Sequence, residues 1–176
     1  MGERGDDNDA QTTVGLGRTL RDGKVDPQAL VIFPQCPLTT TWAQDALPIA
    51  TAALDQSMRD YAIDPQRVSL TGISMGGAGA WSLAIEQRRR FSALAPVCGW
   101  APRPYQKSAE RLRGLPIWIL HGSDDPVIPV AESRAMAAAL GADATYTELP
   151  GVKHNSWDPA YETTGVVEWL IAQRRR

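Results

Sequence analysis

Short apolar runs recur along the chain, and each is separated from the next by a longer segment with apolar residues at helical spacing. Such runs are typical of buried strands, and such spacing is typical of amphipathic helices. The expected strands cover residues Ala29–Phe33, Val68–Ile73, Phe91–Val97, Leu115–Leu120 and Ala144–Leu149. The expected helices cover residues Gln11–Leu20, Trp42–Tyr61, Met75–Gln87, Glu132–Leu140 and Glu162–Gln173. This alternation predicts a single α/β domain over residues 1–176, with a mostly parallel sheet and helices on both faces.

The tightest transition surrounds Ser74, between an expected strand and an expected helix. The chain there reads Gly72-Ile73-Ser74-Met75-Gly76. A Gly-x-Ser-x-Gly sequence between a strand and a helix is typical of a nucleophile elbow, a sharp turn that exposes the serine hydroxyl. The turn strains the serine backbone, so its close neighbours must be small, and we expect Gly72 and Gly76 to meet that need. Because a serine hydroxyl is a weak nucleophile by itself, this interpretation requires a base and an orienting acid elsewhere.

Candidate partners for Ser74 follow the later strands, because catalytic groups of parallel sheets gather beyond the carboxyl ends of the strands. Asp124 and Asp125 follow one strand, and His154 follows the last strand, which gives the order Ser, Asp, His. An imidazole suits the role of base because its ordinary pKa lies near neutrality. His121, the other histidine, stands directly at a strand end and is expected to be a structural residue.

Composition and charge restrict the partners of the chain. Of its 176 residues, 43% are hydrophobic and 22% are charged, as in soluble globular domains. A formal net charge of −2 gives no electrostatic attraction to nucleic acid or to an anionic membrane, and no apolar run approaches the roughly 20 residues of a membrane span. Cys36 and Cys98 show neither metal-ligand spacing nor a disulfide framework, so buried free thiols are expected, with a disulfide between them as the alternative. We expect no metal and no cofactor.

Five segments carry a joint similarity to a known family. They are Gly2-Glu3-Arg4-Gly5-Asp6-Asp7-Asn8, Pro34-Gln35-Cys36-Pro37, Leu70-Thr71-Gly72-Ile73-Ser74-Met75-Gly76-Gly77, His121-Gly122-Ser123-Asp124-Asp125-Pro126-Val127-Ile128-Pro129 and His154-Asn155-Ser156-Trp157-Asp158-Pro159-Ala160-Tyr161. With these segments the chain resembles α/β-hydrolase esterases of the phospholipase/carboxylesterase and "predicted peptidase" type, relatives of dienelactone hydrolase and feruloyl esterases. The resemblance extends over essentially the whole chain.

The resemblance implies a serine esterase with Ser74 as nucleophile and His154 as base. The family pattern His-Gly-x-x-Asp places the acid at its fifth position, which is Asp125, and Asp124 is the alternative. The backbone N–H of Met75, directly after the nucleophile, would be one oxyanion donor. The implied partner is a small ester substrate, with no nucleic acid and no membrane.

The start of the chain departs from the family pattern. In relatives, a strand ends in His-Gly-x-Gly-Glu-Arg-Gly and the x residue is the second oxyanion donor, a position that Met1 occupies here. The resemblance therefore implies an N-terminally truncated α/β-hydrolase fold, without the central strand that usually lies between Ala29–Phe33 and the elbow strand. An absent strand should leave two strand edges unpaired or force the neighbouring strands to close up. A truncated chain or a minimal hydrolase with repaired pairing is favoured, and a homo-oligomer that covers an exposed edge is the third explanation. The loss of one oxyanion donor typically lowers the rate by about 10²- to 10³-fold.

The expected substrates are short-chain or small soluble carboxylic esters. The segment Cys98–Gly114, where many hydrolases insert a lid, is short, so we expect an open site without a lid domain. Trp100, Asn155 and Trp157 are the candidate substrate-binding residues. A non-catalytic or weakly active hydrolase remnant is the alternative function, and a serine peptidase is a less favoured third. The chain as it stands predicts a cytoplasmic protein, whereas an export signal upstream of Met1 would make it secreted.

Overall fold

A four-stranded parallel sheet lies at the centre of the computed structural model, which describes residues 3–43 and 45–175. The sheet order is β1-β2-β3-β4, so strands that are consecutive in the sequence lie side by side. Its strands are β1 (Ser69–Ile73), β2 (Ala93–Val97), β3 (Ile117–Gly122) and β4 (Ala144–Leu149). The expected parallel sheet is therefore confirmed. Parallel neighbours must be joined by crossover connections, and the helices between the strands are the crossovers that the sequence pattern indicated.

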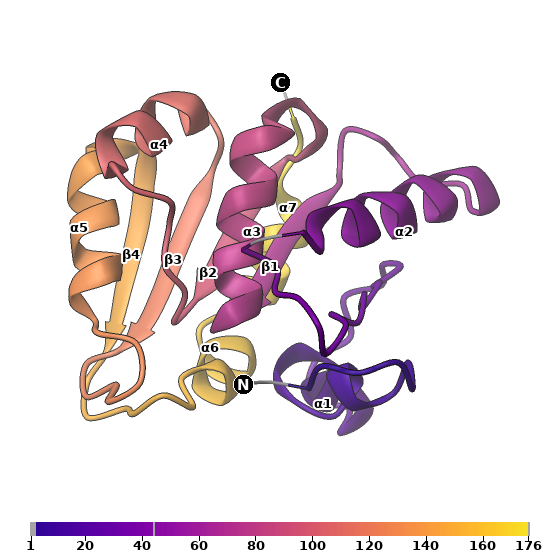
Figure 1. The fold of residues 1–176 in the computed structure, drawn as a ribbon, viewed down its shortest axis with the longest axis horizontal. Coiled ribbons are helices and arrows are strands. Elements are labelled where there is room, and N and C mark those ends of the chain that lie inside the picture. Colours follow the sequence, from indigo (N-terminus) through magenta and orange to yellow (C-terminus); the bar gives the residue numbers. More distant parts are fainter. Residues whose placement is uncertain (1–2, 44, 176) are drawn as a thin grey trace.

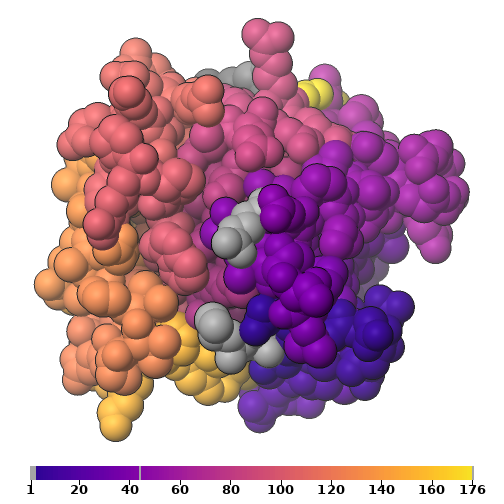
Figure 2. Space-filling model, viewed as in Figure 1, coloured from indigo at the N-terminus to yellow at the C-terminus, as the bar shows by residue number. Residues whose placement is uncertain are grey.

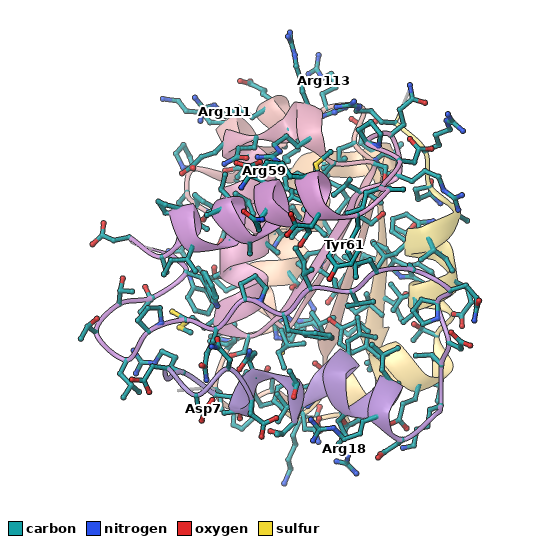
Figure 3. The ribbon with its side chains drawn as sticks, turned by 90° about the vertical axis from the view of Figure 1, so that its right-hand side faces the viewer. Asp7, Arg18, Arg59, Tyr61, Arg111 and Arg113 are labelled. Carbon is teal, nitrogen blue, oxygen red and sulfur yellow. The ribbon has the colours of Figure 1, made fainter. Side chains whose placement is uncertain are left out.

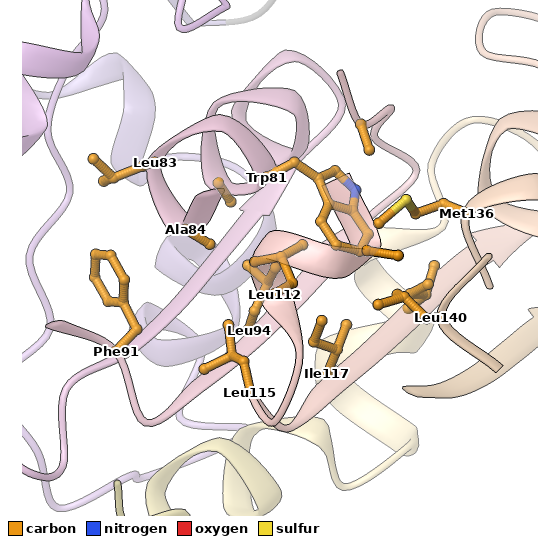
Figure 4. Packing of buried hydrophobic residues seen from close by; sticks show 14 of the residues in the cluster. Trp81, Leu83, Ala84, Phe91, Leu94, Leu112, Leu115, Ile117, Met136 and Leu140 are labelled. Atoms are coloured by element: carbon orange, nitrogen blue, oxygen red, sulfur yellow. The ribbon is translucent and has the colours of Figure 1, made fainter. Parts of the chain in front are cut away.

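Helices cover both faces of the sheet, as Figure 1 shows. One face carries α2 (Leu47–Asp60), α3 (Met75–Glu86), α4 (Tyr105–Leu112) and α5 (Ala131–Leu140), and the other carries α1 (Gly15–Arg21), α6 (Trp157–Thr163) and α7 (Val166–Ala172). Each face has its own apolar core. Trp81 of α3, only 1% exposed, packs in the first core with Leu112 and Met136 (Figure 4). None of the described helices has both the length and the apolar character needed to cross a membrane.

Glycines and a proline set helix boundaries that differ from the expected ones. The first expected helix is instead a 3₁₀ turn, η1 (Ala10–Thr12), followed by α1, where Gly15 has a φ of +51°. The last expected helix is divided into α6 and α7 at Gly165, whose φ is +77°. These left-handed conformations suit glycine and interrupt a right-handed helix. α2 begins at Leu47, later than expected, and Pro48 occupies its first turn, where proline is tolerated.

The helix α4 was not expected, because the segment before it is rich in glycine and proline. Ser108, Ala109 and Leu112 are buried, and α4 packs against α3 and α5. Tyr105, Ala109 and Leu112 stand at i, i+4 and i+7, which is the signal that could have identified this helix. Between β2 and β3 the chain therefore holds a short helix of the covering layer, in agreement with the expected absence of a lid domain.

The prediction of a strand over Ala29–Phe33 is wrong. This segment is extended but belongs to no sheet, and a cavity of about 660 Å³ lies between it and β1. We call this cavity the β1 slot; its lining includes Leu30, Ile32, Leu70 and Leu170. Leu30 and Ile32 remain 49% and 37% exposed. Figure 3 looks onto this side of the molecule, where extended chain runs between α2 and α1. A strand needs a neighbour for its ladder hydrogen bonds, and the slot separates this segment from β1.

The β1 slot leaves one edge of the sheet open. The N–H of Ser74 donates to Val97 and the carbonyl of Val68 accepts from Ser92, so the even-numbered residues of β1 direct their backbone groups toward β2. Because these directions alternate along a strand, the backbone groups of Ser69, Thr71 and Ile73 face the slot. β1 is thus an edge strand, as expected from the sequence. Figure 2 shows the N-terminal part of the chain, indigo to purple, gathered on this side and α4 and α5 on the opposite side.

The N-terminal loop is hydrogen-bonded to residues 35–40, which follow the extended segment Ala29–Phe33 in the chain. The Gln35 amide donates to Asp7 Oδ1 at 2.8 Å, and the Arg4 guanidinium donates to the carbonyl oxygens of Leu38 and Thr40, both at 3.1 Å. These contacts join residues about 30 positions apart in the chain. Arg4 therefore anchors this loop.

Candidate active site

Ser74 occupies the turn between β1 and α3 with a strained backbone. Its φ of +51° and ψ of −117° lie in a region that residues other than glycine rarely adopt. A β-carbon at Gly72 would collide with the backbone carbonyl of Gly76, which explains the first glycine of the motif. A β-carbon at Gly76 would meet nothing within 4 Å, so the expectation that the turn requires both glycines for steric reasons is wrong at Gly76.

His154 lies in the loop between β4 and α6 and contacts Ser74 directly. Its Nε2 is 3.0 Å from Ser74 Oγ, and its Nδ1 is 2.7 Å from Asp125 Oδ2. Since an ionised carboxylate only accepts hydrogen bonds, Nδ1 carries the hydrogen, and the lone pair of Nε2 faces the serine hydroxyl. The three side chains come from segments that follow β1, β3 and β4, whose carboxyl ends lie at the same end of the parallel sheet. The arrowheads of β3 and β4 mark this end in Figure 1.

Asp125 is the aspartate that contacts His154, and its side chain is fully buried. Its other oxygen, Oδ1, accepts the N–H groups of Val127 and Ile128 at 2.8 and 2.9 Å. Burial acts to raise the pKa of this carboxyl, but hydrogen bonds from His154 and from the two backbone N–H groups outweigh it and hold the pKa below its ordinary 3.8. Asp124, the alternative, is exposed and accepts a hydrogen bond from Ser123 instead.

Of the two expected oxyanion donors, Met75 lies within the described residues and Met1 does not. Met75 is the first residue of α3, and the first N–H groups of a helix have no partner within the helix. Its backbone N–H is therefore free of helical hydrogen bonding directly beside Ser74. Met1, the expected second donor, lies outside the described residues.

The comparison with known families agrees with this arrangement of strand, elbow and helix. The sequence model of the Phospholipase/Carboxylesterase family matches residues 43–163, which include Ser74, Asp125 and His154. The chain belongs to this family. The expected phospholipase/carboxylesterase type is thereby confirmed.

Individual relatives of this carboxylesterase-family chain are similar over different shares of its length. A crystal structure described as a thermostable esterase has a TM-score of 0.80 at 31% identity, over 99% of this chain and 52% of that one. An uncharacterized protein of Mycobacterium tuberculosis is 30% identical over 111 residues, and the match covers 53% of this chain and 40% of its own. Acyl-protein thioesterase 1 of Gibberella zeae is 25% identical over 111 residues, and that match covers 58% of this chain and 47% of its own.

These similarities confirm the α/β-hydrolase fold and support a hydrolase of the esterase or thioesterase type. The chain spans about half the length of the thermostable esterase and less than half of the two curated relatives.

The expected substrate-binding residues of the carboxylesterase-family chain take three different positions. Trp157 lies against His154, with ring centroids 5.4 Å apart in an edge-to-face arrangement. Asn155 donates to Asp158 Oδ2 at 2.9 Å, in the first turn of α6, so its amide supports the loop that carries His154. Trp100 is half-buried in the loop after β2, at the same edge of the sheet as Ser74. Trp157 and Asn155 therefore contact His154 or support its loop, and substrate binding by all three residues stays a prediction.

Cys98, at the end of β2, is the remaining polarisable group beside the candidate site. Its sulfur, an Asp125 oxygen and a His154 nitrogen lie within 4.8 Å of one another, a spacing that can hold a metal ion. However, burial raises the pKa of the Cys98 thiol to about 12, which keeps it protonated and a poor ligand. Asp125 and His154 are hydrogen-bonded to each other. These three residues therefore fit a hydrogen-bonded relay better than a metal centre. Cys36 and Cys98 are both buried free thiols, as expected.

Sequence reasoning did not identify the two backbone N–H groups that hold Asp125. The signal for them was present, because an aspartate followed by proline favours a turn in which the side chain accepts N–H groups further along the chain. Asp125 precedes Pro126, and Asp124 does not precede a proline. This difference could have favoured Asp125 from the residues alone.

Proposed function

We propose that the chain is a serine esterase that hydrolyses small carboxylic esters through an acyl-enzyme. The observation that carries the proposal is the unbroken series of hydrogen bonds from Ser74 to His154 to Asp125. A nucleophile, a base with its lone pair directed at that nucleophile, and a buried carboxylate that orients the base are the parts that acyl transfer requires.

In the proposed mechanism, Ser74 Oγ attacks the ester carbonyl while His154 Nε2 takes its proton. Asp125 stays ionised, keeps the imidazole oriented and stabilises the imidazolium that forms. His154 then protonates the departing alcohol, and the acyl group remains on Ser74. Water, deprotonated by the same imidazole, attacks the acyl-enzyme and releases the carboxylic acid with the serine regenerated.

The Met75 N–H supports charge stabilisation at the carbonyl oxygen. It follows the nucleophile directly at the start of α3, where the positive end of the helix dipole also favours a developing negative charge.

The expected substrate class is a short-chain, soluble ester. The His154 side chain is 21% exposed, and the segment between β2 and β3 packs onto the helical layer as α4, which supports a site that is open to solvent. The similarity to an acyl-protein thioesterase makes thioesters a second class to test, since the same serine can attack either carbonyl.

A set of p-nitrophenyl esters from acetate to dodecanoate tests the proposal, with S-acetylthiocholine as the thioester. We expect hydrolysis that is highest for the shortest esters and absent in Ser74→Ala. Ser82→Ala, a serine-to-alanine change further along the same helix, is the matched control and should retain wild-type rates. A fluorophosphonate probe should label wild type on Ser74, as read by mass spectrometry. Equal rates for wild type and Ser74→Ala would contradict the esterase proposal and favour the non-catalytic alternative.

A further inference from the structure

His121 is a fully buried histidine that the proposed mechanism does not use. It stands near the end of β3 with 0% of its surface exposed. Its Nε2 lies 3.2 Å from Asp125 Oδ2 and 3.1 Å from the carbonyl oxygen of Ile128, and its Nδ1 lies 2.7 Å from Ser133 Oγ. Both ring nitrogens are therefore hydrogen-bonded inside the protein, next to the carboxylate that contacts His154.

The partners of His121 determine which ring nitrogen carries the hydrogen. Nε2 faces a carboxylate oxygen and a carbonyl oxygen, and both groups only accept hydrogen bonds, so Nε2 must be the donor. Burial lowers the pKa of His121 and favours the neutral ring. In a neutral ring Nδ1 is then an acceptor, and the Ser133 hydroxyl donates to it. Ser133, on α5, thus satisfies the one nitrogen that remains.

With His121 included, the Asp125 carboxylate has as many donors as it can accept. Oδ1 receives two backbone N–H groups, and Oδ2 receives the Nδ1–H of His154 and a share of the Nε2–H of His121, which also points to the carbonyl oxygen of Ile128. A carboxylate offers about four lone-pair sites, so all of them are used, and the plane of the carboxylate is fixed. A carboxylate held on both oxygens cannot rotate away from His154 without losing a buried hydrogen bond.

We propose that His121 is a positioning residue, a neutral imidazole that donates its Nε2 hydrogen to Asp125 and holds this carboxylate directed at His154. The inference rests on the proposed function, because the orientation of Asp125 matters for catalysis only if His154 is the base. It predicts that the donor at Nε2, rather than the volume of the ring, is what the site requires.

Other charged groups near His121 are accounted for. Glu148 of β4 stands opposite His121 in the sheet register, but it is paired with Arg134 and Tyr146. The imidazole of His154 contacts Oδ2, the same oxygen of the Asp125 carboxylate that His121 contacts. Glu148 is common to all His121 variants, so a difference between His121→Gln and His121→Leu reports on the Nε2 donor.

Two substitutions separate hydrogen bonding from packing. His121→Gln places an amide N–H near the position of Nε2, and His121→Leu fills similar space without a donor. We expect His121→Leu to lower kcat on p-nitrophenyl acetate by about ten- to a hundredfold, the equivalent of one hydrogen bond to a charged group, with KM nearly unchanged. His121→Gln should recover most of that loss. In His121→Leu the Asp125 charge is shared with one donor fewer and stabilises the imidazolium more, so the acid limb of the kcat/KM profile should move to higher pH.

Nitrogen-15 NMR of the wild-type protein tests the inference without any activity. The chain has two histidines, so their ring signals are readily assigned. We expect His121 to be neutral with its hydrogen on Nε2 across the neutral pH range. A His121 that is doubly protonated, or that carries its hydrogen on Nδ1, would overturn the inference even if the enzyme is an active esterase.

The two proposals fail in distinguishable ways. If wild type is no faster than Ser74→Ala, the esterase proposal fails, and the NMR tautomer still decides the hydrogen bond from His121 to Asp125. If wild type is active and both His121 variants keep its kcat and pH profile, the positioning role is wrong. Equal kcat losses in both variants, with equal losses in melting temperature, would likewise reduce His121 to a packing residue.

Discussion

The carbonyl oxygen of Gly76 lies where a β-carbon on Gly72 would stand, so the turn that carries Ser74 admits a side chain at Gly76 but not at Gly72. A β-carbon on Gly72 would occupy the space of the Gly76 carbonyl oxygen, whereas a β-carbon on Gly76 would meet no atom within 4 Å. The two glycines of the motif are therefore not equivalent.

This asymmetry predicts opposite outcomes for two alanine substitutions. Gly72→Ala should destabilise the protein by about 1–3 kcal/mol through overpacking and should displace Ser74 from His154, with loss of ester hydrolysis. Gly76→Ala should leave the melting temperature within about 2 °C of wild type, because a surface-like change without contacts is nearly neutral. Thermal unfolding and ester hydrolysis measured on both variants check the prediction, and a Gly76→Ala protein as unstable as Gly72→Ala would contradict it.

Asp124 and Asp125 are adjacent in the sequence but have different surroundings. Asp125 contacts His154 from a buried position, and Asp124 is exposed beside Ser123. Asp125→Asn should lower kcat by about 10³- to 10⁴-fold, because an amide at this position no longer selects the productive tautomer of the base. Asp124→Asn is the matched control and should stay within about twofold of wild type, as expected for an exposed residue. Steady-state kinetics on both variants decide between the two aspartates, and a large loss in Asp124→Asn would reverse the assignment.

Much of the candidate site was predictable because its signals are local. Five consecutive residues, Gly72–Gly76, indicate the strand-to-helix turn at Ser74. The rule that catalytic groups gather beyond the carboxyl ends of parallel strands predicted that Asp125 and His154 lie near it. The choice of Asp125 over Asp124 was open from the residues and came from family resemblance. Its physical reason is the turn, signalled by Pro126, that directs the N–H groups of Val127 and Ile128 at one carboxylate.

The parts of the fold that sequence reasoning missed depend on contacts between distant segments. Ala29–Phe33 has the composition of a strand, but a strand exists only with a neighbour at ladder distance, and here the β1 slot intervenes. The division of the last helix depends on a single backbone dihedral at Gly165, which the apolar pattern does not contain. The contact of His121 with Asp125 depends on a side-chain orientation that no spacing in the chain reveals.

The pKa of Asp125 predicts how stability depends on pH. Its folded-state pKa lies below the ordinary value, so the ionised carboxylate stabilises the fold above the unfolded pKa of about 3.9, and this contribution is lost as the pH falls through the folded pKa. Asp125→Asn should therefore be less stable than wild type at pH 7, by about 1–3 kcal/mol for the buried hydrogen bonds that it loses. The gap in melting temperature between the two proteins should shrink as the pH falls below about 4.

Thermal unfolding of wild type, Asp125→Asn and Asp124→Asn from pH 7 to pH 3 measures this effect. Asp7 and Glu148 also have pKa values below their ordinary ones. As the pH falls, the stability that these two carboxylates contribute is lost equally in all three proteins. The difference between variants removes their contribution. A gap between wild type and Asp125→Asn that stays constant to pH 3 would show that the Asp125 carboxylate is not preferentially ionised in the folded protein.

The open edge of β1 predicts self-association of this chain. Backbone groups of Ser69, Thr71 and Ile73 face the β1 slot, and exposed Leu30 and Ile32 line its far wall. An unpaired, apolar sheet edge is a template for pairing with another chain, and a second copy is the partner that every solution of the protein contains. We expect sedimentation velocity to show a larger species that grows with protein concentration.

A lysine at the slot should oppose this association, because it would place a charge on the apolar wall that the second copy covers. Ile32→Lys should shift wild-type oligomers toward monomer. Leu38→Lys is the matched control, since Leu38 is 67% exposed and lies outside the slot lining, and it should associate like wild type. A wild-type protein that remains monomeric at all concentrations, or a Leu38→Lys protein that dissociates as fully as Ile32→Lys, would show that the β1 edge is not the surface of contact.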